Sequence, residues 1–185
     1  MEGRAPGDWD LGRAVFRLII VAIVGTALAF VAAPFFAFRA VQAAARDGDG
    51  HALAQLVDYA AVRQGLRPQL AAKPVAAPPP PDIWTDPIGA VKRAIEPIAP
   101  TPPAIEPYLS APGLYALSRG YTPEAAPPGD EGRKLASLRY WDPNRARFLA
   151  RPKGAQDPAQ GVIFTFERRG PFAWKLVQIR LPEIK

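Results

Sequence analysis

The sequence predicts an α+β protein in which an N-terminal transmembrane helix precedes short helices packed on a C-terminal antiparallel sheet of about four strands. Three observations support this fold class. Residues 18–38 are apolar throughout, residues 39–73 have helical periodicity, and residues 135–182 alternate in polarity between turn-forming residues. Because a sheet with one apolar side needs a cover, helices gathered on one face are expected.

The membrane helix is predicted from the run "LIIVAIVGTALAFVAAPFFAF", residues 18–38, which has 21 residues and no charge. About 20 helical residues, each rising about 1.5 Å, cross a hydrocarbon layer of about 30 Å. Arg17 and Arg39 flank the run, and residues 1–17 form a short N-terminal tail. We therefore expect the lipid bilayer to be a partner of this chain through residues 18–38.

Two other interpretations of the apolar run are weaker. A cleaved signal peptide has an apolar core of about 7–15 residues followed by a small-x-small site. Ala27-Leu28-Ala29 resembles such a site, but apolar residues continue for nine more positions. A buried helix of a soluble protein is rarely apolar on all sides over such a length. An uncleaved anchor is therefore preferred.

The arginines near the span favour a single-pass topology with most of the chain outside the cytoplasm. Arg4, Arg13 and Arg17 precede the span, whereas Arg39 and Arg46 are the nearest basic residues after it. Because basic residues accumulate on the cytoplasmic side of a membrane, this difference favours a cytoplasmic N-terminus.

Residues 39–73 are predicted to form a helical hairpin. The helix of the span continues through "FRAVQAAARD" and ends at Asp47-Gly48, where glycine suits the left-handed position after a helix. Asp49 can cap the next helix. Apolar residues then recur at helical spacing: Leu53, Leu56, Val57 and Ala60, followed by Val62, Leu66 and Leu70. These helices should cover an apolar surface formed later in the sequence.

Residues 74–134 form a proline-rich segment, because fifteen of the 23 prolines lie between Pro74 and Pro128. This density excludes regular structure over most of the interval. Two short helices are expected within it, at residues 86–96 and 111–119. Ser110 should cap the second of them, and Gly120 should end it.

Residues 135–182 are predicted to form the antiparallel meander. Asp142-Pro143-Asn144 and Gly170-Pro171 provide turns between the runs of alternating polarity. The alternation is clearest in two runs. In the first, Val162, Phe164 and Phe166 alternate with Ile163, Thr165 and Glu167. In the second, Lys175, Val177, Ile179 and Leu181 alternate with Trp174, Leu176, Gln178 and Arg180.

The composition removes several classes of chemistry. The chain has no cysteine, one methionine and a single histidine, His51. A disulfide framework, thiolate metal sites and thiol catalysis are therefore excluded, and the usual transition-metal ligands are almost lacking. We expect no metal and no cofactor.

The positive charge is concentrated in the C-terminal third. Residues 131–185 carry twelve Lys and Arg against five Asp and Glu, an excess of seven positive charges. Such a surface can attract lipid headgroups, nucleic acid or acidic proteins, or can keep an exposed sheet soluble. The solubility interpretation is favoured because the basic residues alternate with core positions. An extracytoplasmic anchor argues against nucleic acid as a partner.

The segments just described resemble an uncharacterised bacterial family catalogued as domain of unknown function 2939. The resemblance covers most of residues 30–182 and is carried by "FRAVQAAARDGDGHALAQLVDYAAVRQGLRPQL", "DPIGAVKRAIEPI", "SAPGLYAL", "YWDPNRARF" and "WKLVQIRLP". It implies a membrane-anchored protein of Gram-negative bacteria. With the topology favoured by the arginines near the span, the soluble domain of such a protein would lie in the periplasm. The order of helices before a meander is also similar to the cone-shaped NTF2-like fold, although the chain departs from the family in its heavier proline content between residues 74 and 128.

No catalytic residues are predicted, but five residues are candidates for a pocket or site. His51 and Asp49 lie at a helix start, where an aspartate could orient a histidine base, although a solvated histidine beside a capping aspartate is the preferred interpretation. Trp141, Phe164 and Trp174 provide aromatic mass for a pocket in a curved sheet, or simply for a core.

The sequence therefore favours a membrane-anchored protein that binds or scaffolds and does not catalyse. A protein partner or an anionic component of the cell envelope would suit it. The alternative is a small-molecule-binding or enzymatic NTF2-like domain with a pocket between the sheet and the helices.

Overall fold

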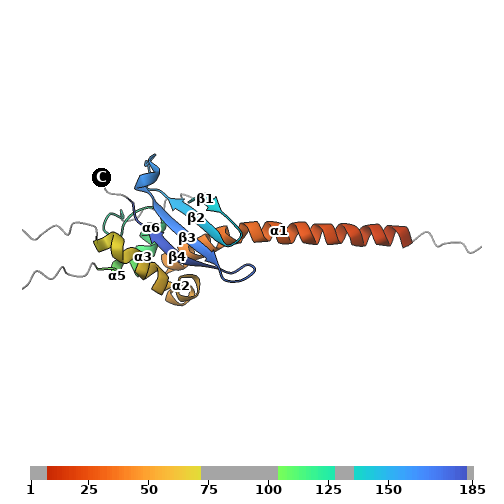
Figure 1. Cartoon of the computed structure of the whole chain (residues 1–185), viewed down its shortest axis with the longest axis horizontal. Coiled ribbons are helices and arrows are strands. Elements are labelled where there is room, and N and C mark those ends of the chain that lie inside the picture. Colours follow the sequence, from red (N-terminus) through yellow and green to blue (C-terminus); the bar gives the residue numbers. More distant parts are fainter. Residues whose placement is uncertain (1–7, 72–103, 128–135, 183–185) are drawn as a thin grey trace, which may run out of the picture.

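The computed structural model describes residues 8–71, 104–127 and 136–182, with side chains from residue 12 onward. Within these ranges helices precede an antiparallel sheet, so the predicted α+β class is confirmed (Figure 1). The helices are α1 (Asp8–Asp47), α2 (Gly50–Leu56), α3 (Tyr59–Ala71), α5 (Glu106–Leu109) and α6 (Ala111–Ser118). The strands are β1 (Ser137–Trp141), β2 (Arg145–Ala150), β3 (Val162–Arg168) and β4 (Trp174–Arg180), and the short 3-10 helix η1 (Pro158–Gln160) lies between β2 and β3.

The four strands form one sheet in the order β1-β2-β3-β4, with every neighbouring pair antiparallel. The predicted turn between β1 and β2 is held by Asp142, whose Oδ1 accepts hydrogen bonds from the backbone N–H groups of Asn144 and Arg145, each at 2.7 Å. This local bonding fixes the hairpin register because an aspartate reproduces the geometry of a backbone turn.

Helix α1 has two parts with different surroundings. Its N-terminal part projects away from the rest of the chain, whereas its C-terminal part enters the domain (Figure 1). The buried residues of the second part recur at helical spacing: Ala33, Pro34, Phe38, Val41, Ala44 and Ala45. The helix continues past the predicted end of the span, as the alanine-rich segment indicated. Phe38, which the sequence analysis assigns to the span, is 3% exposed and belongs to the core.

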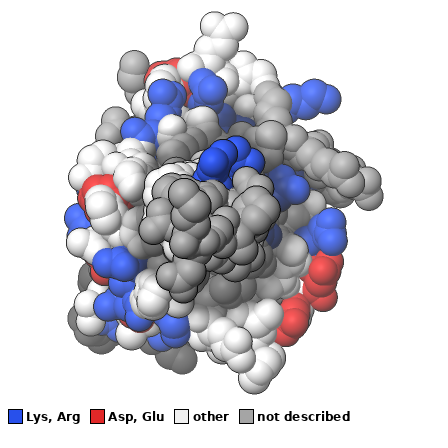
Figure 2. All heavy atoms as spheres, turned by 90° about the vertical axis from the view of Figure 1, so that its right-hand side faces the viewer, with Lys and Arg blue, Asp and Glu red and all other residues white. Residues whose placement is uncertain are grey.

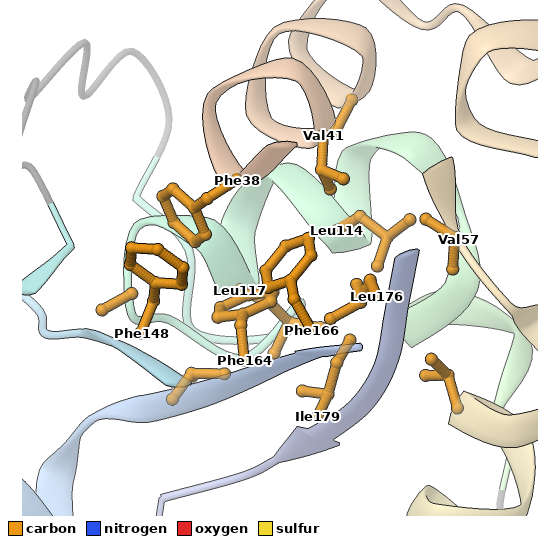
Figure 3. Packing of buried hydrophobic residues seen from close by; sticks show 14 of the residues in the cluster. Phe38, Val41, Val57, Leu114, Leu117, Phe148, Phe164, Phe166, Leu176 and Ile179 are labelled. Atoms are coloured by element: carbon orange, nitrogen blue, oxygen red, sulfur yellow. The ribbon is translucent and has the colours of Figure 1, made fainter. Parts of the chain in front are cut away.

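The core lies between α1, α6 and the inner face of the sheet (Figure 3). Phe38 stacks on Phe148 of β2, with ring centroids 5.1 Å apart, and meets Phe164 of β3 edge-on at 5.4 Å. Leu114 and Leu117 of α6 are fully buried in the same cluster. Phe38 of α1 therefore packs in the same buried cluster as residues of the sheet and of α6, and removing these apolar side chains from water stabilises the fold.

The chain reverses after α1 at the predicted corner. Gly48 has φ 71°, the left-handed conformation that favours glycine, and Asp49 Oδ1 accepts a hydrogen bond from Ala52 N at 2.9 Å. Helix α2 therefore begins with a side-chain cap. Asp58 caps α3 in the same way, through Ala61 N at 3.1 Å.

Helix α3 runs beside the outer edge of β4 and closes that edge. Gln69 donates from Nε2 to the carbonyl oxygen of Ile179 at 2.9 Å and accepts at Oε1 from Leu181 N, also at 2.9 Å. Its side chain thus occupies the place that a neighbouring strand would take. An open strand edge invites pairing with another chain, so this amide protects the sheet.

The second predicted helix of the proline-rich segment is present as α6. Ser110 caps it by accepting from Gly113 N at 3.1 Å, as expected. Gly120 follows the helix with φ 91°, and a Cβ there would lie 2.4 Å from the Arg151 carbonyl carbon, so this position requires glycine. Helix α5 was not predicted. The expected helix at residues 86–96 lies outside the described residues.

Candidate functional site

The structure places the five candidate residues in three separate parts of the fold. His51 and Asp49 lie at the corner between α1 and α2, Phe164 and Trp174 are buried in the core, and Trp141 ends β1. They do not form one site.

The corner between α1 and α2 carries no reactive arrangement. The Asp49 carboxylate is used as the cap of α2. His51 is exposed, and its Nε2 lies 3.1 Å from Nε2 of Gln55, one turn along the same helix. Among the described residues, no group of three or more His, Asp or Glu is placed to hold a metal ion. The preferred interpretation of this pair, a solvated histidine beside a capping aspartate, fits the observed geometry.

The space between α1 and the sheet is occupied by aromatic rings. Phe148, Phe164 and Phe166 are fully buried, and Phe38 of α1 contacts all three. Trp174 is also buried, and its indole Nε1 has no hydrogen-bond partner among the described residues. This part of the interior therefore serves as a packed core.

Aromatic and basic side chains meet where α1 leaves the domain. Phe30 of α1 contacts the Trp141 ring edge-on, with centroids 6.5 Å apart, and the Arg168 guanidinium lies over the same Phe30 ring at 5.4 Å. The β1–β2 turn and the β3–β4 hairpin point toward the projecting half of α1 (Figure 1). The end of the sheet that carries these turns is therefore beside Phe30.

We call this end of the sheet the collar. It comprises Tyr140, Trp141, Arg145, Arg147, Arg168, Arg169 and Phe172. Its members come from the end of β1, the start of β2, the end of β3 and the β3–β4 hairpin. Figure 2, which views the molecule along α1 from its projecting end, shows Lys and Arg outnumbering Asp and Glu around the helix.

Ion pairs and hydrogen bonds fix the arginines of the collar. Arg145 donates from Nη2 to Glu167 Oε1 at 2.7 Å, and this bond raises the pKa of the arginine. Arg168 donates from Nη2 to Asn144 Oδ1 at 2.9 Å. Arg169 Nη2 lies 3.7 Å from a carboxylate oxygen of both Asp58 and Glu167. The guanidinium groups are thus held in place without being sealed from water.

A tyrosine and an aspartate form a second polar contact of the collar. The Tyr140 hydroxyl donates a hydrogen bond to the Asp142 carboxylate, which raises the pKa of the phenol and lowers the pKa of the carboxyl. The Arg147 guanidinium lies 5.3 Å from the centroid of the Tyr140 ring, so the same tyrosine also carries a cation–π contact. Asp142 is therefore ionised at neutral pH.

Large apolar side chains are exposed beside the collar. On the projecting part of α1 these residues are between 44% and 68% exposed: Val15, Phe16, Leu18, Ile19, Ile20, Val21, Ile23, Val24, Leu28 and Val31. Phe36 of α1 and Phe172 of the hairpin are also exposed, by 67% and 54%. Of the described residues, only α1 forms a helix long and apolar enough to cross a membrane, a criterion that an N-terminal signal sequence would also meet.

Sequence reasoning singled out Trp141 but missed its arginine neighbours. Arg168 was one of twelve basic residues in the C-terminal third, and its alternation with Phe164 and Phe166 was the only available signal. Every second residue of a strand lies on the same face of the sheet. Arg168 therefore lies on the face of β3 that carries Phe164 and Phe166, at the end of that apolar series.

The family model described as "Protein of unknown function (DUF2939)" matches residues 23–117, just over half of the chain. The chain therefore belongs to this family, as the sequence resemblance predicted. The matched region runs from the projecting part of α1 through α6 and ends before the sheet. No curated protein and no solved structure matches the sequence, so the similarity to the NTF2-like fold stays a prediction.

Proposed function

We propose that this member of the DUF2939 family is a single-pass membrane protein whose uncleaved helix α1 holds a binding or scaffolding domain at the membrane surface. The proposal is carried by one observation. The same helix supplies both an exposed apolar segment of membrane length and a buried stripe of the core. The domain is therefore built directly on its anchor.

The length of the projecting segment fits a membrane. Between Gly12 and Val31 the described side chains are exposed except for the half-buried Phe30. About 20 residues at about 1.5 Å each span about 30 Å, the thickness of a bilayer's hydrocarbon core. Arg13 and Arg17 lie near its far end, where long basic side chains reach the headgroups while their stems stay in lipid.

The exposed apolar surface favours retention of the helix over its removal. Cleavage after Ala29 would leave Val31, Phe35 and Phe36 on the remaining chain, and all three are exposed. A soluble protein gains nothing from exposing these apolar side chains, whereas lipid would cover them. An uncleaved anchor accounts for these residues, and a signal peptide does not.

Binding is favoured over catalysis by the contents of the interior and of the corner. Aromatic rings occupy the space where a pocket between α1 and the sheet would lie, and among the described residues His51 has no acidic or nucleophilic hydrogen-bond partner. We place the domain outside the cytoplasm, in the periplasm of a Gram-negative cell, because the arginines before the span outnumber those close after it. Its ligand would then be another envelope protein or an anionic envelope component.

Reporter fusions test both the anchor and the orientation. Alkaline phosphatase fused after Lys185 should be active, and a fluorescent protein fused at the same position should stay dark. The full-length chain should remain in the membrane pellet after alkaline washing, with its N-terminal residues intact. A product that begins at Phe30 and is released by alkali would refute the anchor.

A further inference from the structure

We propose that the collar is a lipid-docking surface, on which the arginines contact phosphates of anionic phospholipids in the membrane that α1 crosses. This inference rests on the proposed function, because it takes α1 as a membrane span. It adds that the end of the sheet lies on the bilayer, with a preference for anionic headgroups.

The position of the bilayer surface follows from the contacts of Phe30. This residue ends a span of about 20 residues, and it touches both Trp141 and Arg168. Whatever depth Phe30 occupies, those two side chains are beside it. A helix that crosses the bilayer up to Phe30 therefore brings the end of β1 and the end of β3 to the headgroups.

The chemistry of the collar matches that depth. Aromatic side chains with a polar group are enriched where hydrocarbon meets headgroups, and Tyr140 and Trp141 stand there. Phe172 is 54% exposed on the hairpin, and Phe36 is 67% exposed on the side of α1 away from the buried stripe. A tilted span, which is usual for membrane helices, would immerse both at the interface.

The charge of the collar selects anionic lipid over neutral lipid. Its four arginines face two nearby carboxylates, Asp142 and Glu167, and Arg169 also reaches Asp58. A guanidinium pairs with phosphate oxygens through two parallel hydrogen bonds, which suits a headgroup better than a single point charge would. Basic residues near an anionic surface strengthen its attraction for the protein, and the effect falls off within a Debye length.

A protein partner is less well supported as the occupant of this surface. The collar contacts α1 at Phe30, next to the exposed apolar segment of that helix, so any partner there would also have to lie beside the bilayer. Lipid alone covers both the helix and the adjoining aromatic residues.

The experiment uses single-cysteine labelling of the full chain, which contains no native cysteine. Phe172→Cys probes the collar. Gly25→Cys probes the span, and a Cβ added at position 25 would have no heavy atom within 4 Å, so the cysteine fits there. Gln156→Cys probes the exposed loop between β2 and β3, at the opposite end of the sheet. Each is coupled to a polarity-sensitive fluorophore and reconstituted in phosphatidylcholine vesicles with or without phosphatidylglycerol, and a spin-labelled lipid serves as quencher.

We expect the fluorescence emission of the label at position 172 to be blue-shifted and to be quenched by the spin-labelled lipid. Both effects should be stronger in vesicles with phosphatidylglycerol than in vesicles without it. The label at position 156 should remain in water under both conditions. The double substitution Arg168→Gln and Arg169→Gln should abolish the additional blue shift and quenching that phosphatidylglycerol causes at position 172. Arg180→Gln is the control, because it removes an exposed arginine near the far end of β4, and it should preserve that additional effect. High salt should act like the double substitution.

The outcomes separate this inference from the proposed function. A label at position 25 that is quenched by lipid, with a label at position 172 that stays in water, would overturn the docking surface and leave the anchor intact. A label at position 172 that is shielded from water but not quenched by lipid would indicate a protein partner and would also overturn the docking surface. A water-exposed label at position 25 would overturn the anchor itself.

Discussion

Substitution of Phe38 by alanine should destabilise the domain, because this apolar residue of α1 is packed in the core. Phe38 is 3% exposed and contacts the rings of Phe148, Phe164 and Phe166, with centroids between 5.1 and 6.2 Å away. Removing a buried phenylalanine costs about 3–5 kcal/mol. The upper half of that range is expected, because aromatic pairs add about 0.5–1.5 kcal/mol each beyond the buried area.

The assay compares Phe38→Ala with Phe36→Ala in the full chain, in detergent micelles, by the thermal loss of β-sheet circular dichroism. Phe36 is the matched control because it lies two residues away on the same helix and is 67% exposed. At about 4 °C or more per kcal/mol for a domain of this size, a loss of about 4 kcal/mol in Phe38→Ala should lower the midpoint by at least about 16 °C. Phe36→Ala should change the free energy of unfolding by less than about 0.5 kcal/mol. Equal midpoints for the two variants would refute the assignment of α1 to the core.

Three further predictions test local features of the domain. Asp49→Ala should cost about 1 kcal/mol in chemical unfolding because it removes the cap of α2, whereas His51→Ala should be neutral in the same experiment. Gln69→Ala should cost about 1–3 kcal/mol and promote self-association seen by light scattering, because it leaves polar groups of the β4 edge without partners. Burial and the hydrogen bond to Glu124 raise the pKa of Tyr108 to about 12, so the stability it contributes is complete below about pH 10 and is lost as pH rises toward 12. Ultraviolet titration should show that late ionisation step in the native protein and its loss in Tyr108→Phe; a step near pH 10 instead would contradict the assigned burial.

Local chemistry made much of the fold predictable. The corner at Gly48, the cap at Ser110 and the turn at Asp142 each depend on residues within about three positions of one another. Such features can be recognised along the chain because the donor, the acceptor and the backbone conformation all belong to one short segment. The strand run that contains Phe164 and Phe166 was also predictable, since its alternation continues without a break into the core.

The strand β4 shows where alternation fails as a guide. Thr165 pairs with Gln178 and the adjacent Phe166 pairs with Leu176, so Val177 is an extra residue that forms a bulge. The bulge changes the phase of the strand, and Leu176 and Ile179 both face the core although alternation would place them on opposite faces. The residue types of β4 do not predict the bulge, because the bulge arises from the way β3 and β4 pair.

The contacts that define the collar and the closed edge were beyond sequence reasoning for a different reason. Gln69 is 110 residues from Ile179, and Phe30 belongs to a long uncharged run in which nearly every residue is apolar. An apolar run has no signal that distinguishes a side chain facing lipid from one facing protein, since both surroundings are apolar. Phe36 and Phe38 demonstrate the point: two residues apart, one is 67% exposed and the other 3%.

The exposed segment of α1 and its buried stripe belong to one continuous helix, which fixes the orientation of the domain relative to that segment. Helix α1 continues without interruption from the exposed segment into the domain, with Pro34 inside the helix and buried. From Phe30 to Asp47 the helix rises about 26 Å at about 1.5 Å per residue. Because the buried stripe of α1 packs on the sheet, the domain cannot turn about its anchor without breaking its own core. Under the proposed function, a ligand of this protein would therefore be met at a fixed orientation and close to the membrane, which suits a partner that is itself held at that surface.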